Sequence, residues 1–284
     1  MALILSGKEA AAAIKANIKE QVDARIAAGG KRPHLAAILV GDNPASAAYV
    51  RGKVRDCDQV GFESTLVKMP TEATEAEVLT EIEKLNANPD VCGFIVQLPL
   101  PDHIDDDRVL MAIDPTKDVD GFHPESVGRM ALGLPTFLPA TPYGILMMLE
   151  HFNIETSGKR AVVVGRSNIV GSPMSILLSR NSKVGNATVT LAHSRTQDLE
   201  GLCKEADIIV AAIGRPGFIT ANHVSEGAVV IDVGINRVND KLVGDVAFDE
   251  VEPIASAITP VPGGVGLMTR VGLLMNTLQA TDER

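Results

Sequence analysis

The chain has no tryptophan, and aromatic residues make up only 3% of its 284 positions. It also has no excess of positive charge, because its formal net charge is −10 at pH 7. A surface for nucleic acid or an anionic membrane needs clustered basic residues, and single strands also need aromatic side chains for stacking. The composition therefore argues against a nucleic-acid partner and against a membrane partner.

Cysteines are also few. Cys57, Cys92 and Cys203 are odd in number and far apart, which predicts a reducing compartment and no disulfide framework. No cysteine or histidine spacing is typical of a metal site, so we expect no bound metal. Residues 1–5 lack the basic and apolar regions of a signal peptide, and no apolar run has transmembrane length. We expect a cytoplasmic protein.

The sequence does contain two series of alternating strand-like and helix-like segments. This alternation predicts an α/β protein with two α/β domains, each with a parallel sheet, separated by a cleft. The motifs described next lead us to expect that the N-terminal one is the α/β catalytic domain and the other a Rossmann-type NADP-binding domain. We expect the first domain at 1–147 and the second at 148–264, with the last helix, 265–284, packing back on the first. The expected strands are 35–40, 63–69, 92–98, 161–164, 187–191, 207–212 and 228–233, with a short one at 241–244, and the expected helices include 43–60, 74–85, 141–152 and 265–281.

The segment 160–173 gives the clearest signal for a ligand. A buried apolar strand leads into Gly165, and Ser172 followed by Pro173 predicts an N-cap and first turn of a helix. A strand that leads into a helix N-terminus favours phosphate, because free backbone N–H groups and the helix dipole meet there. The spacing is G-x-S-x-x-x-G, with Ser167 in place of the second glycine of the common dinucleotide fingerprint. An ordinary strand–turn–helix without a ligand is the alternative.

The residues after the next strand indicate which dinucleotide is bound. An NAD site has an acidic residue at the end of the second strand, which binds the ribose hydroxyls. Here that strand ends in His193, Ser194 and Arg195, with no carboxylate. Arg195 offers a bidentate partner for a phosphate, and Arg166 in the glycine turn offers a second, which favours NADP. Solvated loop charges are the alternative.

A lysine in the expected helix 43–60 is a candidate for acid–base chemistry. Tyr49 and Lys53 are i,i+4 neighbours at the edge of an apolar stripe, where desolvation lowers the pKa of a lysine. A lysine that snorkels beside a tyrosine is the alternative. Gln97 at the end of a buried strand and Asp120 in a turn-rich loop could complete a polar pocket, or act as a strand-end cap and an Asx turn.

Six ordered segments resemble the bifunctional methylenetetrahydrofolate dehydrogenase/methenyltetrahydrofolate cyclohydrolase family in its short, mostly bacterial form. The resemblance covers nearly the whole chain. The segments are Tyr49-Val-Arg-Gly-Lys53, Val96-Gln-Leu-Pro-Leu-Pro101, Lys117-Asp-Val-Asp-Gly-Phe122, Gly165-Arg-Ser-Asn-Ile-Val-Gly171, Ile231-Asp-Val-Gly-Ile-Asn236 and Pro260-Val-Pro-Gly-Gly-Val-Gly266.

The resemblance implies roles for four residues of the first series. Lys53 would act on water, or on the adduct, during attack on the methenyl carbon. Tyr49 would stack on the folate, and Gln97 would orient Lys53 and tune its proton affinity. Asp120 would hold the amino-pyrimidine edge of the pterin.

The resemblance also implies binding residues in the rest of the chain, and a homodimer. The wall of the folate site would consist of Pro262, Gly263 and Gly264. The contacts to NADP would come from Gly165, Arg166, Ser167, Ser194 and Ile235, with Arg195 near the phosphate.

The chain departs from the usual family pattern at Ala140, Tyr143, Ser172 and Leu267. None of these positions carries a proposed catalytic group. Leu267 replaces a proline of the last glycine-rich motif, so it bears on folate affinity more than on reaction type.

The resulting expectation is a tetrahydrofolate enzyme. It would oxidise 5,10-methylenetetrahydrofolate with NADP and hydrolyse the methenyl product to 10-formyltetrahydrofolate. The alternatives are a monofunctional dehydrogenase, a shikimate-type NADP dehydrogenase and a non-catalytic NADP-binding sensor. The shikimate type offers no reason for the Asp120 loop or for the segment 260–266.

Overall fold

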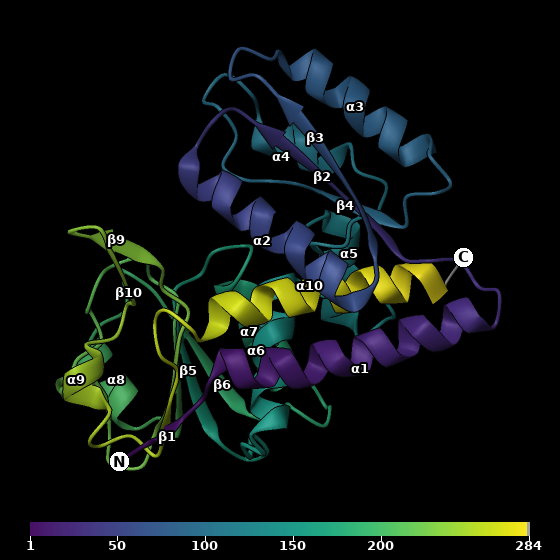
Figure 1. Cartoon of the computed structure of the whole chain (residues 1–284). Coiled ribbons are helices and arrows are strands. Elements are labelled where there is room, and N and C mark those ends of the chain that lie inside the picture. Colours follow the sequence, from purple (N-terminus) through teal and green to yellow (C-terminus); the bar gives the residue numbers. More distant parts are fainter. Residues whose placement is uncertain (283–284) are drawn as a thin grey trace. The chain divides into compact units, whose positions relative to one another are not determined.

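The computed structural model describes residues 1–282 and divides into two compact units (Figure 1). The first unit contains Met1–Ala12 and Thr141–Thr269. The second unit contains Ala13–Ala140 and the chain from Arg270 onward. Two helices, α1 (Gly7–Ala27) and α10 (Val265–Asp282), therefore contribute residues to both units.

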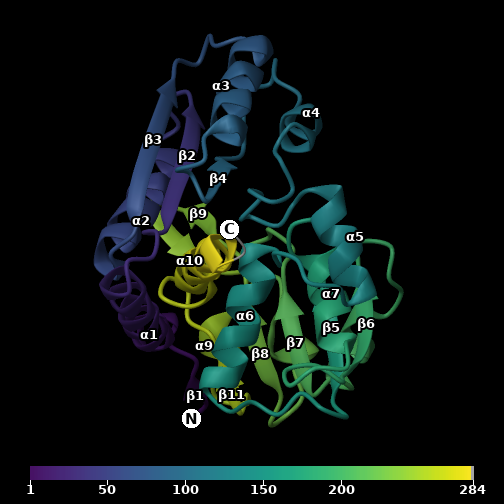
Figure 2. The ribbon, with the colours of Figure 1, turned by 90° about the vertical axis from the view of Figure 1, so that its right-hand side faces the viewer.

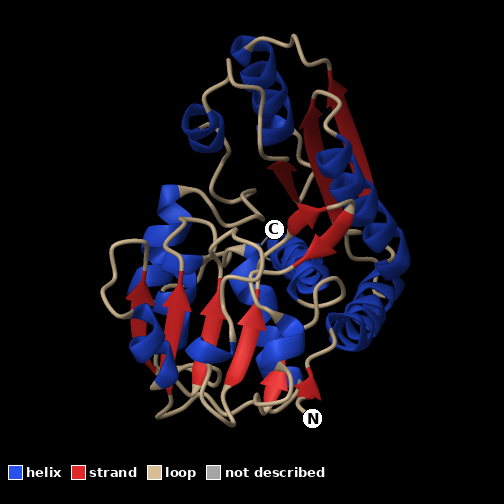
Figure 3. Cartoon of the chain, turned by 90° about the vertical axis from the view of Figure 1, so that its left-hand side faces the viewer, coloured by secondary structure: helices blue, strands red, loops and turns tan. Residues whose placement is uncertain are grey.

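The first unit is built on a six-stranded sheet in the order β1-β11-β8-β7-β5-β6, in which every neighbouring pair is parallel. The strand arrows point the same way in Figure 3. Helices α6 and α7 lie on one face and α8 and α9 on the other (Figures 1 and 2). The elements are β1 (Leu3–Ile4), α6 (Ala140–His151), β5 (Arg160–Val164), α7 (Gly171–Ser179), β6 (Thr188–Ala192), α8 (Leu199–Lys204), β7 (Ile208–Ala211), the 3-10 helix η1 (Ala221–His223), β8 (Val229–Asp232), α9 (Phe248–Val251) and β11 (Ala257–Ile258), with an antiparallel hairpin of β9 (Asn236–Val238) and β10 (Lys241–Val243).

The direction of strand succession reverses at β5, which has β6 on one side and β7 on the other. In open α/β sheets ligands bind beyond the carboxyl ends of the strands at such a reversal. The strand is apolar at successive positions because helices cover both faces of the sheet, and the side chains of Ala161–Val164 are all buried. The predicted glycine turn follows this strand directly, so the topology places it at the expected ligand edge.

The second unit has a three-stranded parallel sheet in the order β3-β2-β4. Alternate residues of the central strand β2 enter two different cores. Leu35, Ala37 and Leu39 pack with residues of α1, α2 and α10, whereas Ala36, Ile38 and Val40 pack with residues of α3. The elements are β2 (His34–Val40), α2 (Pro44–Val60), β3 (Glu63–Met69), α3 (Glu75–Ala87), β4 (Gly93–Val96), α4 (Asp106–Met111) and α5 (Pro124–Leu132).

Local capping explains where two of the predicted helices begin. The Asn43 side chain accepts hydrogen bonds from the N–H groups of Ala45 and Ser46, and α2 starts at the following proline. Thr74 and Glu77 form a reciprocal capping box at the start of α3. Both predicted helix starts are confirmed.

The prediction that Ser172 is the N-cap of the helix after the glycine turn is wrong. Helix α7 begins at Gly171, and Val170 occupies the N-cap position without a side-chain cap. The hydroxyl of Ser167 accepts from the N–H groups of Val170 and Gly171, at 3.2 and 3.4 Å. Ser172 lies inside the helix, where its hydroxyl donates to the Arg166 carbonyl oxygen. Ser167 does the capping because the turn brings its side chain back over the helix start.

Helices α1, α4, α5 and α9 and strands β1, β9 and β11 have no counterpart among the predicted elements. None of the helices within residues 1–282 combines the length and the apolar character that crossing a bilayer requires.

Candidate active site

Helix α2 positions Tyr49 and Lys53 in the second unit. Val50 and Cys57 anchor the helix in the core with no exposed surface. One helical turn separates Tyr49 from Lys53, so their side chains leave the same side of the helix. Tyr49 remains 36% exposed, whereas Lys53 is only 8% exposed. The tyrosine ring is thus open to a ligand, and the lysine is desolvated.

Gln97 is the hydrogen-bond partner of Lys53. The Lys53 Nζ donates to the Gln97 Oε1 at 3.3 Å, and the Gln97 Nε2 donates to the carbonyl oxygen of Leu98 at 2.7 Å. Gln97 follows β4, and its own N–H donates to the carbonyl oxygen of Ile38 in β2. These bonds orient the amide so that its oxygen faces the amine, at the carboxyl edge of the sheet.

The surroundings of Lys53 make it easier to deprotonate than a lysine in water. Burial lowers the pKa of Lys53, and the nearby charge of Arg270 lowers it further. The negative charge of Asp120 and the Cys57 thiol act in the opposite direction. Burial also raises the pKa of Asp120, which the charge of Lys53 lowers in turn. An amine with a lowered pKa at this edge is suited to proton transfer.

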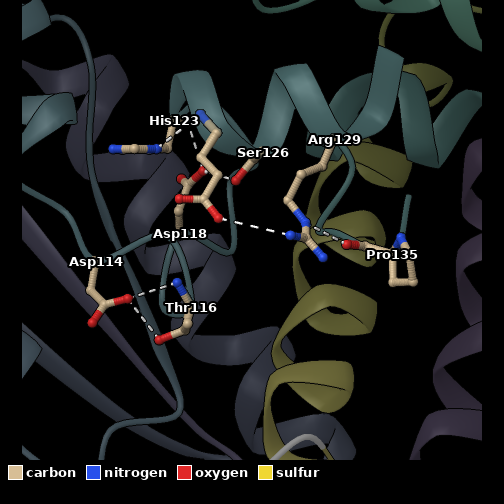
Figure 4. A network of polar contacts seen from close by, with 8 residues as sticks. Asp114, Thr116, Asp118, His123, Ser126, Arg129 and Pro135 are labelled. Atoms are coloured by element: carbon tan, nitrogen blue, oxygen red, sulfur yellow. Dashed lines mark hydrogen bonds and ion pairs between the residues drawn. The ribbon is translucent and has the colours of Figure 1, made fainter. Parts of the chain in front are cut away.

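The Asp120 carboxylate has no hydrogen-bond partner within residues 1–282. The turn interactions nearby belong to other side chains (Figure 4). Asp118 accepts from the His123 N–H at 2.8 Å and from the Ser126 hydroxyl at 3.0 Å. Asp114 makes the Asx-type contact to the Thr116 N–H at 2.8 Å. Asp120 is therefore available to bind a ligand.

The loop that carries Asp120 is held on both sides. Gly121 has a φ of +72°, and a Cβ there would overlap the Leu138 backbone, so only glycine fits. Asn276 of α10 is fully buried, and its Nδ2 donates at 2.8 Å to the carbonyl oxygens of both Val119 and Leu138. The last helix thus fixes the backbone next to Asp120.

Sequence reasoning missed a buried ion cluster next to Lys53. The Asp56 carboxylate is 3% exposed and pairs with the Lys15 Nζ at 3.1 Å and with the Arg270 Nε at 2.9 Å. A Cβ at Gly52 would overlap the Arg270 Nη1, so the guanidinium lies against the α2 backbone between Tyr49 and Lys53. Glycine destabilises the interior of a helix, so Gly52 was the one sequence signal that another group packs closely against the backbone of this helix.

The glycine turn lies in the first unit. Gly165 has a φ of +119°, and a Cβ there would overlap the carbonyl oxygen of Ala212. A Cβ at Gly171 would in turn overlap the carbonyl oxygen of Gly165. The backbone N–H groups of Arg166 and Ser167 donate to no acceptor within residues 1–282. Close backbone packing and free N–H groups fit a bound phosphate.

The predicted basic residues follow neighbouring strands. Val164 pairs with Ala192, so Arg166 and Arg195 emerge from adjacent strand ends. Both arginines and Ser194 are exposed, and neither guanidinium forms an ion pair in the part of the chain that the structure describes. Two uncompensated cations at this edge fit an additional phosphate on the ribose.

The remaining predicted residues also lie in the first unit. Ile235 is 45% exposed, next to β9. In the segment of Pro262, Gly263 and Gly264, the carbonyl oxygen of Gly264 leaves no room for a Cβ at Gly7. The structure thus brings Tyr49 and the three polar residues together in one unit and gathers the predicted dinucleotide residues in the other.

Within residues 1–282 no three histidine, cysteine or acidic side chains form a group that could hold a metal ion. The three cysteines are free and buried, and burial raises the pKa of Cys57 to about 12 and that of Cys203 to about 11. Thiols that resist ionisation are poor nucleophiles.

Comparison with known proteins extends the resemblance of the six segments to the whole chain. The model of the tetrahydrofolate dehydrogenase/cyclohydrolase catalytic domain matches residues 5–120, and that of the NAD(P)-binding domain of the same family matches residues 139–284. The bifunctional protein FolD of Cytophaga hutchinsonii is 59% identical over 284 residues, covering 98% of each chain.

Solved structures agree with these matches. The bifunctional FolD enzyme of Campylobacter jejuni has a TM-score of 0.95 at 45% identity and covers 100% of both chains. The Trypanosoma brucei enzyme, complexed with NADP cofactor and inhibitor, has a TM-score of 0.94 at 36% identity, covering 99% of this chain and 98% of that one. The chain belongs to the tetrahydrofolate dehydrogenase/cyclohydrolase family.

Proposed function

We propose that the chain oxidises 5,10-methylenetetrahydrofolate with NADP and hydrolyses the 5,10-methenyl product to 10-formyltetrahydrofolate, with Lys53 as the proton-transfer group of the second reaction. The observation that carries this assignment is the desolvated Lys53 amine, 3.3 Å from the Gln97 amide oxygen and close to the charge of Asp120. The family membership supports a bifunctional enzyme of one-carbon metabolism.

The dehydrogenase step needs positioning more than proton handling. The methylene carbon loses a hydride and becomes the methenyl carbon of a cation, and NADP held at the glycine turn would supply the hydride acceptor. Tyr49 stacks on the folate, and Asp120 binds the amino-pyrimidine edge. Such contacts accelerate the reaction by orienting the reacting atoms.

The hydrolytic step needs a proton acceptor. Water attacks the methenyl carbon, a C–O bond forms, and the neutral Lys53 amine accepts one proton of that water. The bond from this carbon to N5 then breaks. N5 takes the proton from the Lys53 ammonium, and the remaining hydroxyl proton passes to solvent. Gln97 keeps the amine oriented during both transfers.

The dinucleotide is NADP in this proposal. The glycine turn with Gly165 and Ser167 offers its free N–H groups to the diphosphate, with Ser194 and Ile235 as further contacts. Arg166 and Arg195 bind the 2′-phosphate, and no carboxylate stands at the end of β6 to favour NAD. The presence of NADP in the Trypanosoma brucei relative supports this choice.

We also propose a cytoplasmic homodimer, in which 1–147 forms the folate-binding domain and 148–264 the NADP-binding domain. The three free thiols support a reducing compartment. The dimer rests on the family resemblance.

One assay tests the proposal. The purified chain is given 5,10-methylenetetrahydrofolate with either NADP or NAD, and the absorbance of the methenyl intermediate is followed as it forms and decays. We expect formation to be faster with NADP and to be followed by enzyme-dependent hydrolysis. Methenyl product that accumulates at the uncatalysed decay rate would indicate a monofunctional dehydrogenase. Binding of NADP without turnover would indicate a sensor.

A further inference from the structure

Two buried carboxylates, Asp232 and Asp245, lie at the carboxyl edge of the sheet in the first unit. Asp232 ends β8 and is 3% exposed, and Asp245 follows β10 and is 0% exposed. Neither carboxylate has a cationic partner within residues 1–282. Buried charges without a counter-ion are tolerated only when hydrogen-bond donors surround them, so the donors show what this pair holds in place.

Asp245 binds three consecutive backbone N–H groups. Its Oδ2 accepts from Ile213 at 2.6 Å and from Gly214 at 2.8 Å, and its Oδ1 accepts from Arg215 at 2.9 Å. Consecutive N–H groups of this kind form an anion-binding concavity. Here the protein's own carboxylate fills it, so these N–H groups are not available to a phosphate, and the conformation of the loop 213–215 depends on Asp245.

This loop borders the glycine turn. It follows β7, which pairs with β5 along the sheet. The residue before it, Ala212, places its carbonyl oxygen where a Cβ of Gly165 would lie. The Ala212 N–H also donates to the carbonyl oxygen of Val164 at 2.8 Å. A shift of the loop would therefore change one wall of the glycine turn.

The carboxylate pair also holds both neighbours of Ile235. The Asn236 Nδ2 donates to the Asp245 Oδ1 at 2.8 Å, and the Gly234 N–H donates to the Asp232 Oδ1 at 2.9 Å. Asp232 in turn accepts from the Asp245 N–H at 2.9 Å. The 45% exposed side chain of Ile235 is thus presented from a backbone fixed on both sides.

We propose that Asp245 is a positioning residue for the dinucleotide. It holds the loop 213–215 beside the glycine turn and holds Ile235 where it meets the cofactor, and Asp232 keeps Asp245 in place. The inference rests on the proposed NADP site at Gly165–Gly171.

The first test is Asp245→Asn in the full chain. The new amide nitrogen cannot accept hydrogen bonds, so the loop or the hairpin loses its anchor. We expect the Kd for NADP, measured by equilibrium dialysis, to rise about tenfold or more. Cyclohydrolase activity on directly supplied 5,10-methenyltetrahydrofolate should stay within about twofold of the unsubstituted chain. Measurements at about pH 8 keep Asp232 ionised, because burial raises its pKa to about 6.

Asp207→Asn is the matched control. The Asp207 Oδ2 accepts from the Arg160 N–H at 2.7 Å, at the amino end of the same sheet. The substitution also replaces a carboxylate that accepts from a backbone N–H, but Asp207 is half-buried and lies at the opposite edge, where no ligand is expected. We expect the Kd for NADP to stay unchanged.

Gly214→Ala keeps the proposal testable if Asp245→Asn does not fold. Gly214 has a φ of +73°, and an added Cβ would have no atom within 4 Å, so the methyl group strains only the loop. We expect the same selective loss of NADP affinity. Unchanged NADP affinity in either folded variant, or an equal fall of both activities in Gly214→Ala, would overturn the role of Asp245. Absence of NADP binding by the unsubstituted chain would instead contradict the proposed cofactor.

Discussion

The Nζ of Lys53 lies 3.3 Å from the Oε1 of Gln97, and the other end of that amide is committed to the Leu98 carbonyl oxygen. The amide therefore cannot turn its nitrogen toward the lysine without losing a hydrogen bond. The pair joins helix α2 to the carboxyl end of β4, and the consequences for proton transfer can be measured.

Lys53→Met should separate the two activities. The variant keeps a side chain of similar length but has no proton acceptor. We expect cyclohydrolase activity to fall by about 100-fold or more, whereas dehydrogenase activity is partly retained. Initial rates with 5,10-methenyltetrahydrofolate and with 5,10-methylenetetrahydrofolate plus NADP measure the two. The exposed Lys68→Met on β3 is the control, and equal loss of both activities in Lys53→Met would contradict the role.

Gln97→Glu should shift the pH profile of hydrolysis. A carboxylate beside Lys53 favours the ammonium form, so the pKa of the lysine rises. If the neutral amine is the active form, the rate reaches its plateau only at higher pH than in the unsubstituted chain. Gln97→Ala serves as the uncharged comparison, because it removes the hydrogen bond without adding charge. A profile of Gln97→Glu that coincides with that of Gln97→Ala would exclude the charge effect.

Arg270→Met should shift the same profile in the same direction. The guanidinium lies against the backbone at Gly52 and lowers the pKa of Lys53, so its removal lets that pKa rise. We expect a smaller shift than in Gln97→Glu, because burial is the larger cause of the lowered pKa. Lys15→Met breaks the other ion pair of Asp56 and should leave the profile in place. If Lys15→Met shifts the pH profile as much as Arg270→Met does, the shift comes from a disturbed ion cluster and not from the charge of Arg270.

Arg195→Ala should weaken NADP binding selectively. Loss of a charged hydrogen-bond partner of the 2′-phosphate costs about 1.5–3 kcal/mol, which corresponds to a rise in KM for NADP of about 10- to 150-fold. The KM for NAD should not change. The exposed Arg237→Ala is the control in the same unit. Equal effects on NAD and NADP would remove Arg195 from the phosphate site.

Asn276→Leu should destabilise the loop next to Asp120. The substitution removes the donor to the buried carbonyl oxygen of Val119 and to the partly buried one of Leu138. We expect a loss of about 2–5 kcal/mol in the free energy of unfolding, measured by urea denaturation followed through cyclohydrolase activity. Asn17→Leu on the exposed side of α1 should change it by less than about 0.5 kcal/mol. A midpoint like that of Asn17→Leu would show that Asn276 is not needed to hold the loop.

Local sequence patterns were sufficient for strands β2 to β8 and β10, for several helices and for the family. Apolar runs bounded by turns mark the buried parallel strands, and Asn43 and Thr74 mark helix starts, because these signals act over a few residues. Local patterns also predicted the glycine turn, and the i,i+4 spacing of Tyr49 and Lys53 predicted that their side chains lie on the same side of one helix. The prediction of Ser172 as the N-cap was wrong because two hydroxyls, those of Ser167 and Ser172, lie near the start of α7. Only the geometry of the turn decides which of them accepts from the first N–H groups of the helix.

Tertiary structure alone decided which distant residues meet. Arg270 pairs with Asp56, and Asp245 accepts hydrogen bonds from the loop 213–215. Both contacts join residues far apart in the sequence, so no local pattern predicts them. Strand β1 pairs with β11 at the far end of the chain for the same reason. The sequence by itself determined the family and the order of the main strands and helices, and it predicted the candidate site residues. Burial and long-range packing determined the lowered pKa of Lys53 and the anchoring of the loops, because both depend on neighbours that only the folded chain supplies.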